Sequence, residues 1–200
     1  MEKEIRLSDN RLLRIMQSSI PECPREWDNF GTMACFHKRY DLGDKNIPFH
    51  SDDFSSWEEM EKYIKEELQA VVILPLYLYD HGGITMATTS FSCRWDSGQV
   101  GYIYATKDKI KQEYGIKKIS KNYLEKVEKL LEAEVKTYDQ YLTGDVYGFE
   151  LVKLSKCDQG HEHEEEIDSC WGFYGSNFNE NGLFDHIDLT KEDLKAIDAL

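Results

Sequence analysis

Residues 71–89 read VVILPLYLYDHGGITMATT. The run from Val71 to Tyr79 is rich in β-branched and aromatic residues, a composition typical of a buried strand. The Asp, His and two glycines at 80–83 then predict a tight turn. We therefore expect an antiparallel meander, in which two more strands follow the first after turns: Ile84–Trp95 and Val100–Ala105.

Other strands are predicted where alternating or β-rich segments lie between turn residues. The turn sequence Ser8-Asp9-Asn10 separates two such segments, so the chain should open with a hairpin. The very polar stretch from Ser155 to Glu166 is expected to be a loop between the last two strands. The predicted strands are 4–7, 12–17, 31–37, 145–154 and 167–174.

Residues that can cap a helix N-terminus precede four helical patterns. Ser56 with Glu59 three residues later is a capping box, and Thr190 with Asp193 resembles one. The longest pattern carries an apolar residue every three or four positions from Leu124 to Leu142. The predicted helices are 56–69, 106–115, 120–144 and a short one after Thr190.

This order of elements predicts an α+β fold, with a mainly antiparallel β-sheet and helices packed on one face. The chain has 200 residues, 40% of them hydrophobic, which is enough for a real core. It shows no internal repeat and no long linker. We therefore expect a single domain over residues 1–200, with an acidic C-terminal region at 145–200.

The formal charge of −14 is concentrated near the end of the chain. Residues 1–144 carry 24 acids and 20 Lys or Arg, a net of −4, whereas residues 145–200 carry 14 acids and 4 Lys, a net of −10. Direct binding of nucleic acid needs basic side chains on the phosphates, so this balance disfavours it. It favours a partner with a basic surface, and a solvated acidic face is the simpler alternative.

Membrane and secretory segments are not expected. No apolar run approaches the length of a membrane span, and the first residues, Met1-Glu2-Lys3-Glu4, lack the pattern of a signal peptide. Five cysteines without regular spacing are expected to be free thiols in a reducing compartment. We therefore expect a cytoplasmic protein.

Three arrangements suggest chemistry, and each has a simpler structural interpretation. Soft ligands that could hold zinc occur at Cys157, His161, His163 and Cys170, but their spacing is unusual for a zinc site. Cys35 and His37 share one strand face, as a thiol nucleophile and its base would, although Cys35 also suits a core. Paired carboxylates for hydrolysis could come from Asp96 with Asp139 or Asp145. We expect no cofactor, metal or catalytic residue.

Several residues are of types that commonly contact a binding partner. Arg25, Trp27 and Asp28 share one short loop, and Trp and Arg dominate interface hot spots. Aromatic residues two apart should share a sheet face, which pairs Tyr102 with Tyr104, Tyr147 with Phe149, and Trp171 with Phe173. The predicted binding residues are Arg25, Trp27, Asp28, Trp95, Asp96, Asp145, Glu164, Glu165 and Glu166.

The chain resembles a family of small, uncharacterised proteins carried by bacteriophages and mobile elements of Gram-positive bacteria. Four segments carry the resemblance: PREWDNFGTM (24–33), FSCRWDSGQVG (91–101), YDQYLTG (138–144) and DSCWGFYG (168–175). The family has no established activity, so the resemblance implies a context and no catalytic residue. By analogy, small acidic phage proteins often inhibit host defence.

Two functions are compatible with these observations. The first is a non-enzymatic phage accessory protein whose acidic surface binds a basic host defence protein that handles nucleic acid. The alternative is a small-molecule or nucleotide binder, or a hydrolase, with a pocket lined by aromatic, Asp and His residues. A structural subunit of a phage assembly is a third hypothesis. The sequence leaves the oligomeric state open.

Overall fold

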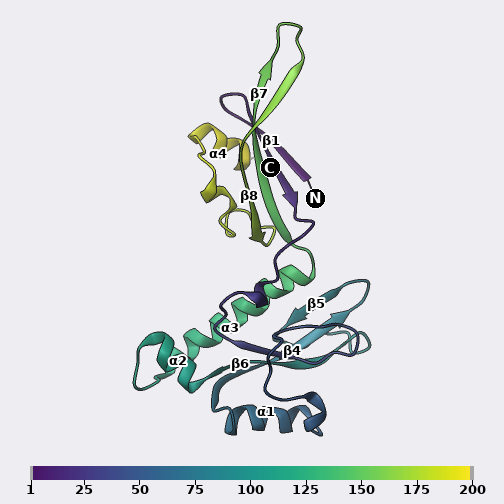
Figure 1. Ribbon diagram of the computed structural model, residues 1–200, viewed down its shortest axis with the longest axis vertical. Coiled ribbons are helices and arrows are strands. Elements are labelled where there is room, and N and C mark those ends of the chain that lie inside the picture. The colour runs from purple at the N-terminus through teal and green to yellow at the C-terminus, as the bar shows by residue number, and fades with distance from the viewer. Residues whose placement is uncertain (1, 199–200) are drawn as a thin grey trace. The chain divides into compact units, whose positions relative to one another are not determined.

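The computed structural model describes residues 2–198, which divide into two compact units (Figure 1). Unit 1 combines both ends of the chain, residues 2–22 and 144–198, and unit 2 is Cys23–Thr143. Both units are α+β with antiparallel strands, as predicted. No long linker marks the boundaries, which is why the sequence indicated one domain. That residues 1–200 form a single domain stays a prediction.

Unit 1 contains a four-stranded sheet in the order β1-β2-β7-β8. The opening hairpin is confirmed, because Asp9 and Asn10 both adopt positive φ, as a tight hairpin turn requires. All neighbouring strands are antiparallel, and β2 from near the N-terminus pairs with β7 from near the C-terminus. The strands are β1 (Glu2–Leu7), β2 (Arg11–Gln17), β7 (Val146–Lys156) and β8 (Glu162–Tyr174).

One face of this sheet is apolar and covered by the C-terminal segment (Figure 1). Alternate residues such as Leu13, Ile15 and Phe149 point into this core, with Phe149 fully buried. The covering elements are the short 3-10 helix η3 (Leu183–His186) and helix α4 (Lys191–Asp198). In unit 1, then, the described helices cover a single sheet face, as the sequence led us to expect.

Asp193 fastens α4 to the opening hairpin. Its N–H bonds the Thr190 hydroxyl, while its carboxylate accepts the Thr190 N–H, which confirms the capping box. The same carboxylate accepts the Ser8 N–H at 2.6 Å and pairs with Arg11 at 2.7 Å. Burial alone raises the pKa of this carboxyl, but the hydrogen bonds from Ser8 and Thr190 outweigh it and lower the pKa to about 2.

A bulge at Gly172 changes which aromatic side chains share a face. Tyr147 pairs with Phe173 but Gly148 pairs with Trp171, so Gly172 is an extra residue, with φ of 94°. Phe173 is therefore buried in the core, whereas Trp171 is 50% exposed on the opposite face. The prediction that Trp171 and Phe173 share a face was wrong for this reason. The other two aromatic pairs are buried as pairs.

Unit 2 contains a second four-stranded sheet, in the order β3-β6-β4-β5. The long strand β4 lies in the middle, paired with β5 on one side and β6 on the other. The predicted strand Ile84–Trp95 was too long, because β5 ends at Ala87 and residues 88–96 form an irregular return. The strands are β3 (Thr32–Cys35), β4 (Ala70–Asp80), β5 (Ile84–Ala87) and β6 (Ser97–Thr106).

Helices cover both faces of this second sheet, where the sequence led us to expect one. Along β6, Tyr102 and Tyr104 pack toward α1, while Ile103 and Ala105 pack toward α3. Both faces are apolar, so each needs a cover. The helices are α1 (Trp57–Glu66), α2 (Lys107–Tyr114) and α3 (Lys121–Leu142), with short 3-10 turns η1 (Pro24–Glu26) and η2 (Ser51–Asp53). None of the described helices is both long and apolar enough to span a membrane.

Substituting Gly148 tests the close packing of Trp171 on β7. A Cβ at this position would overlap the Trp171 indole and lie 2.8 Å from the Cys170 carbonyl oxygen. We expect Gly148→Ala to lower the free energy of unfolding by about 1–3 kcal/mol, measured by urea denaturation. The control is Gly83→Ala, because nothing lies within 4 Å of a Cβ there, and it should shift stability by less than about 0.5 kcal/mol. Equal losses for the two variants would contradict this packing.

Candidate functional site

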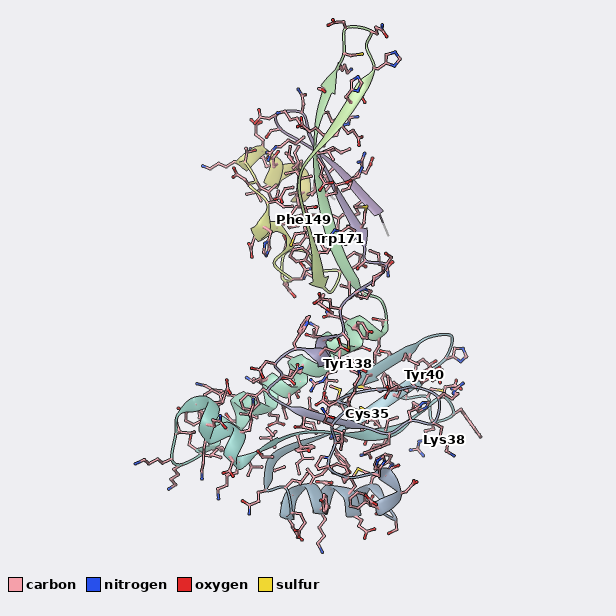
Figure 2. All side chains as sticks on the ribbon, viewed as in Figure 1. Cys35, Lys38, Tyr40, Tyr138, Phe149 and Trp171 are labelled. Atoms are coloured by element: carbon pink, nitrogen blue, oxygen red, sulfur yellow. The ribbon has the colours of Figure 1, made fainter. Side chains whose placement is uncertain are left out.

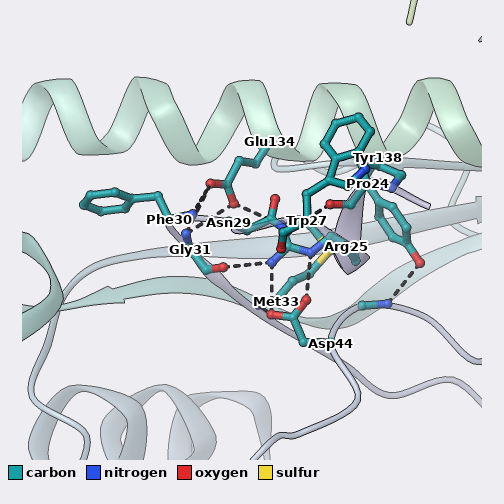
Figure 3. A network of polar contacts seen from close by, with 11 residues as sticks. Pro24, Arg25, Trp27, Asn29, Phe30, Gly31, Met33, Asp44, Glu134 and Tyr138 are labelled. Carbon is teal, nitrogen blue, oxygen red and sulfur yellow. Dashed lines mark hydrogen bonds and ion pairs between the residues drawn. The ribbon is translucent and has the colours of Figure 1, made fainter. Parts of the chain in front are cut away.

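Arg25 lies at the centre of a polar network in unit 2 (Figure 3). Its guanidinium donates to both carboxylate oxygens of Asp44, at 2.8 and 3.0 Å. It also donates to Glu134 on α3 at 2.9 Å and to the Gly31 carbonyl oxygen at 2.8 Å. The side chain is only 2% exposed. Such a planar, multiply bonded arrangement suits Arg and is beyond the reach of Lys.

The two carboxylates extend this network to the backbone. Glu134 accepts the Phe30 N–H at 2.7 Å, and Asp44 accepts the Met33 N–H at 2.8 Å. The network thus fixes the loop between η1 and β3 against α3. Arg25 acts inside the fold and does not present its charge to a partner, contrary to the role expected from the sequence. Of its neighbours in the loop, Trp27 is 46% exposed and Asp28 is exposed.

A cavity of about 780 Å³ adjoins this network. Tyr138 and Tyr141 stack in its wall, with ring centroids 6.0 Å apart, and Tyr138 accepts the Gly43 N–H at 3.0 Å. Burial raises the pKa of Tyr138 to about 12, so its phenol stays protonated near neutral pH. Figure 2 labels Tyr138 and Tyr40 in this part of the unit. Polar lining residues include Arg39, Asp41, Lys45 and Asn46.

Cys35 is not arranged as a nucleophile. Burial, with a smaller contribution from the charge of Asp44, raises the pKa of its thiol to about 12. A reactive cysteine needs the opposite shift, because the thiolate is the attacking form. His37 instead stacks on Tyr40 at 5.0 Å, and its Nδ1 accepts the Arg39 N–H at 3.3 Å. The structure therefore argues against the thiol chemistry considered for Cys35 and His37.

Trp95 is the most exposed large hydrophobic side chain of the described residues, at 96%. Next to it, Asp96 pairs with Nδ1 of His81 at 3.1 Å, which ties the return loop to the β4–β5 turn. Asp139, on α3, makes a different contact: it accepts the Met86 N–H at 2.7 Å and so links β5 to α3. Asp145 belongs to unit 1, just before β7. Asp96 and Asp139 are thus engaged with different elements.

The acidic run forms a β-ribbon and not the expected loop. We call residues 154–166 the acidic ribbon: Leu154–Lys156 of β7 pair with Glu162–Glu164 of β8, and the ladder continues through Glu166. It extends past the ends of the neighbouring strands (Figure 1). Every residue from 158 to 169 is exposed, and this stretch has six acids and no Lys or Arg.

Arg14 secures the base of this ribbon. Its guanidinium binds Glu164 through two hydrogen bonds, at 2.7 and 2.6 Å, and also contacts Glu4 and Glu150. The hydrogen bonds with Arg14 lower the pKa of Glu164, so this carboxylate stays ionised. Among the described residues, no Lys, Arg or His forms an ion pair with Glu165 or Glu166, although Ser169 donates to Glu166 at 2.9 Å.

The proposed zinc ligands do not gather. Cys157 and His161 face each other across the ribbon turn, where the Cys157 N–H bonds the His161 carbonyl oxygen at 3.0 Å. Cys170 pairs with Phe149 much further along the ladder, whereas His163 pairs with Ser155. Within residues 2–198, no group of three or more His, Cys, Asp or Glu side chains is placed to hold a metal.

Sequence reasoning missed the partners of Arg25. Asp44 lies in a loop and Glu134 on a helix face that otherwise looks solvated, so neither carries a local signal. It also missed the pairing of the acidic run. Residues 158–166 contain no apolar side chain and so no apolar–polar alternation, which left this strand without a local signal.

Comparisons with known proteins give no further identification. No family model matches the chain, and neither the curated proteins nor the solved structures searched contain a significant match.

Removing the Arg25 cation tests whether the network organises unit 2. We expect Arg25→Gln to lower the free energy of unfolding by about 3–5 kcal/mol, because it leaves Asp44 and Glu134 without their shared partner. Urea denaturation followed by circular dichroism measures the loss. The control is Arg94→Gln at an exposed position, expected to change stability by less than about 0.5 kcal/mol. If Arg25→Gln is as stable as its control, the network does not stabilise the unit.

Proposed function

We propose that this chain is a non-enzymatic binding protein whose acidic ribbon contacts the basic surface of a protein that handles nucleic acid. One observation carries the proposal. The six acids at 158–169 lie on an exposed, hydrogen-bonded strand and turn that has no Lys or Arg of its own. Glu164 pairs with Arg14 and Glu162 with Lys156, and the other four acids have no ion pair among the described residues. The charges are therefore held in a fixed array before any partner arrives.

The spacing of this array resembles that of a phosphate backbone. A β-strand rises about 3.4 Å per residue, and one strand of duplex DNA carries one charge per about 3.4 Å of axis. Glu164, Glu165 and Glu166 follow one another on β8, so this three-residue segment has a similar linear charge density, although alternate side chains point to opposite faces. A surface built for phosphates offers Lys and Arg at matching intervals.

Pre-organisation and charge both favour such a contact. An ordered strand loses less conformational entropy on binding than a loop does. Complementary charge raises the association rate and the specificity of the encounter. The exposed Trp95 and Trp27 of unit 2 are the kind of side chain that anchors an interface, and they are candidates for further contacts.

The biological setting follows from the resemblance to phage and mobile-element proteins. In that setting the chain acts in the cytoplasm of a bacterial host. Its target is a host defence complex that handles nucleic acid, and the acidic ribbon inhibits the complex by occupying its basic cleft. The charge balance disfavours direct binding of nucleic acid by this surface, since like charges repel.

A second candidate function is binding of a small molecule in the cavity beside Arg25. Its volume of about 780 Å³ is in the usual range for ligand sites. Tyrosine rings and Asp41 line it, as the aromatic and Asp part of the expected pocket would, but the lining includes no His and neither Asp96 nor Asp145. This ligand would be insensitive to changes on the ribbon, so the test below separates the two functions.

Neutralising acids on and next to the ribbon should weaken capture of the partner. We expect Glu165→Gln/Glu166→Gln/Asp168→Asn to weaken binding by about 10- to 100-fold, since exposed charge pairs each contribute up to about 1 kcal/mol. Tagged variants are produced in bacterial cells, the co-purified protein is identified, and its Kd is measured at 50 and 200 mM salt. The wild-type Kd should rise steeply with salt.

The matched control changes three exposed acids of unit 2 by the same charge: Glu61→Gln/Glu128→Gln/Glu132→Gln. It should bind as the wild type does. Equal binding by the ribbon variant and its control, or a Kd that does not change with salt, would reject the proposed function.

A further inference from the structure

Unit 2 contains a groove of about 450 Å³ whose rim is made of lysines. Lys107 and Lys111 come from successive turns of α2, and Lys117 and Lys118 come from the connection between α2 and α3. We call this the lysine groove. Its lining includes no acidic side chain.

These four lysines differ from their neighbours in having no acidic partner. Lys109 pairs with Glu113 at 3.8 Å, and Lys121 pairs with Glu125 at 3.6 Å, both within a helix. No ion pair among the described residues engages any of the four groove lysines. In a chain of net charge −14, four unpaired cations around one concavity create a local field that attracts an anion.

The floor of the groove is apolar. It is formed by Val71, Ile119 and Leu124. Val71 is 41% exposed, because the register between β4 and β6 shifts between Ala70 and Val72 and leaves this residue outside the ladder. A ligand that fits the groove therefore combines several negative charges with an aliphatic group.

We propose that the lysine groove binds the acidic ribbon of a second copy of this chain, through the segment Glu162–Asp168, which comprises the β8 part of the ribbon and the two residues after it. That segment carries five acids, of which Glu162 already pairs with Lys156 and Glu164 with Arg14, so Glu165, Glu166 and Asp168 are the ones without a cation among the described residues. It also carries the half-exposed Ile167, at a second bulge of β8. Its carboxylates match the ammonium groups, and its isoleucine matches the apolar floor. Each copy supplies both the groove and the segment that fills it.

Spacing supports this occupant. Lys107 and Lys111 are four residues apart on α2, which is about 6 Å along a helix axis. Side chains on one face of a strand repeat about every 7 Å. Nucleic acid fits less well, because the lining has no Arg and no aromatic ring for a base to stack on.

The contact is heterologous, since a groove on one copy meets a ribbon on another. Such contacts close into rings or continue as chains. Exposed ion pairs are individually weak and screened by salt, so association is expected at low ionic strength and high protein concentration. The proposal is independent of the proposed function, because its readout is the self-association of the purified chain.

Sedimentation velocity at 25 and 300 mM salt tests the contact. The wild type should associate at 25 mM and dissociate at 300 mM. The groove variant, Lys107→Gln/Lys111→Gln/Lys117→Gln/Lys118→Gln, should raise the dissociation constant at least about tenfold. Its control has the same charge change at exposed lysines outside the groove, and should associate as the wild type does: Lys38→Gln/Lys65→Gln/Lys129→Gln/Lys136→Gln.

A charge exchange makes the test specific. One chain carries Lys→Glu at the four groove positions, and another carries Glu165→Lys/Glu166→Lys/Asp168→Lys. Each should be monomeric alone, and an equimolar mixture should associate. A wild type that stays monomeric at 25 mM salt, a groove variant that associates like its control, or a mixture that stays monomeric would each overturn the proposal. So would groove-dependent binding of a labelled 20-nucleotide single strand by a chain that does not self-associate.

Discussion

The pairing of β2 with β7 is the constraint on which unit 1 depends. It joins residues 11–17 to residues 147–153, with Leu13 opposite Leu151 and Ile15 opposite Phe149. A hairpin of β1 and β2 alone would be marginal in water, because two strands bury too little surface. With β7 added, the sheet has one continuous apolar face, which η3 and α4 can cover. The Leu154 N–H donates to the Asn10 carbonyl oxygen at 2.7 Å, which continues the contact to the base of the acidic ribbon.

This pairing also explains how the acidic ribbon can be ordered without a core of its own. At its Glu165–Glu166 end the ribbon is part of the four-stranded sheet, because the β7 residues opposite these two also pair with β2. Arg14 on β2 forms an ion pair with Glu164 on β8. The ribbon lies at a sheet edge, where charged side chains discourage pairing with other strands. The same charges can therefore protect the edge and present an array to a basic partner. Unit 2 carries charge of the opposite sign at its lysine groove, where four lysines without ion-pair partners among the described residues lie around one concavity.

Local signals in the sequence predicted most elements of the fold. Ser56, Thr106 and Thr190 accept the N-terminal hydrogen bonds of their helices, and Gly115 ends α2 in the left-handed conformation. Signals that depend on a distant partner were missed. The glycine at 172 suggested a turn or a bulge equally well, so the face of Trp171 depended on the pairing of β7 with β8. The place of β4 at the centre of its sheet likewise depends on which strands pair.

Only part of the candidate binding surface was predicted, because some of its features also depend on residues that are distant in the sequence. Exposure of Glu164–Glu166 follows from their charge, and the structure agrees. Arg25 has a residue type that suits interfaces, yet two carboxylates far away in the sequence bury it. Whether the groove lysines have ion-pair partners depends on side-chain geometry, which the sequence does not show. Their positions at 107, 111, 117 and 118 indicate only that α2 and the segment after it are basic.

In this structure the acidic run is a strand that is already formed before any partner binds. Amide hydrogen exchange of the free protein, followed residue by residue by NMR, tests it directly. An edge strand bonds only alternate N–H groups to its neighbour, so alternate amides from Glu162 to Glu166 should exchange at least about tenfold more slowly than in an unstructured peptide. Exchange of all five amides at the unstructured rate would contradict the claim.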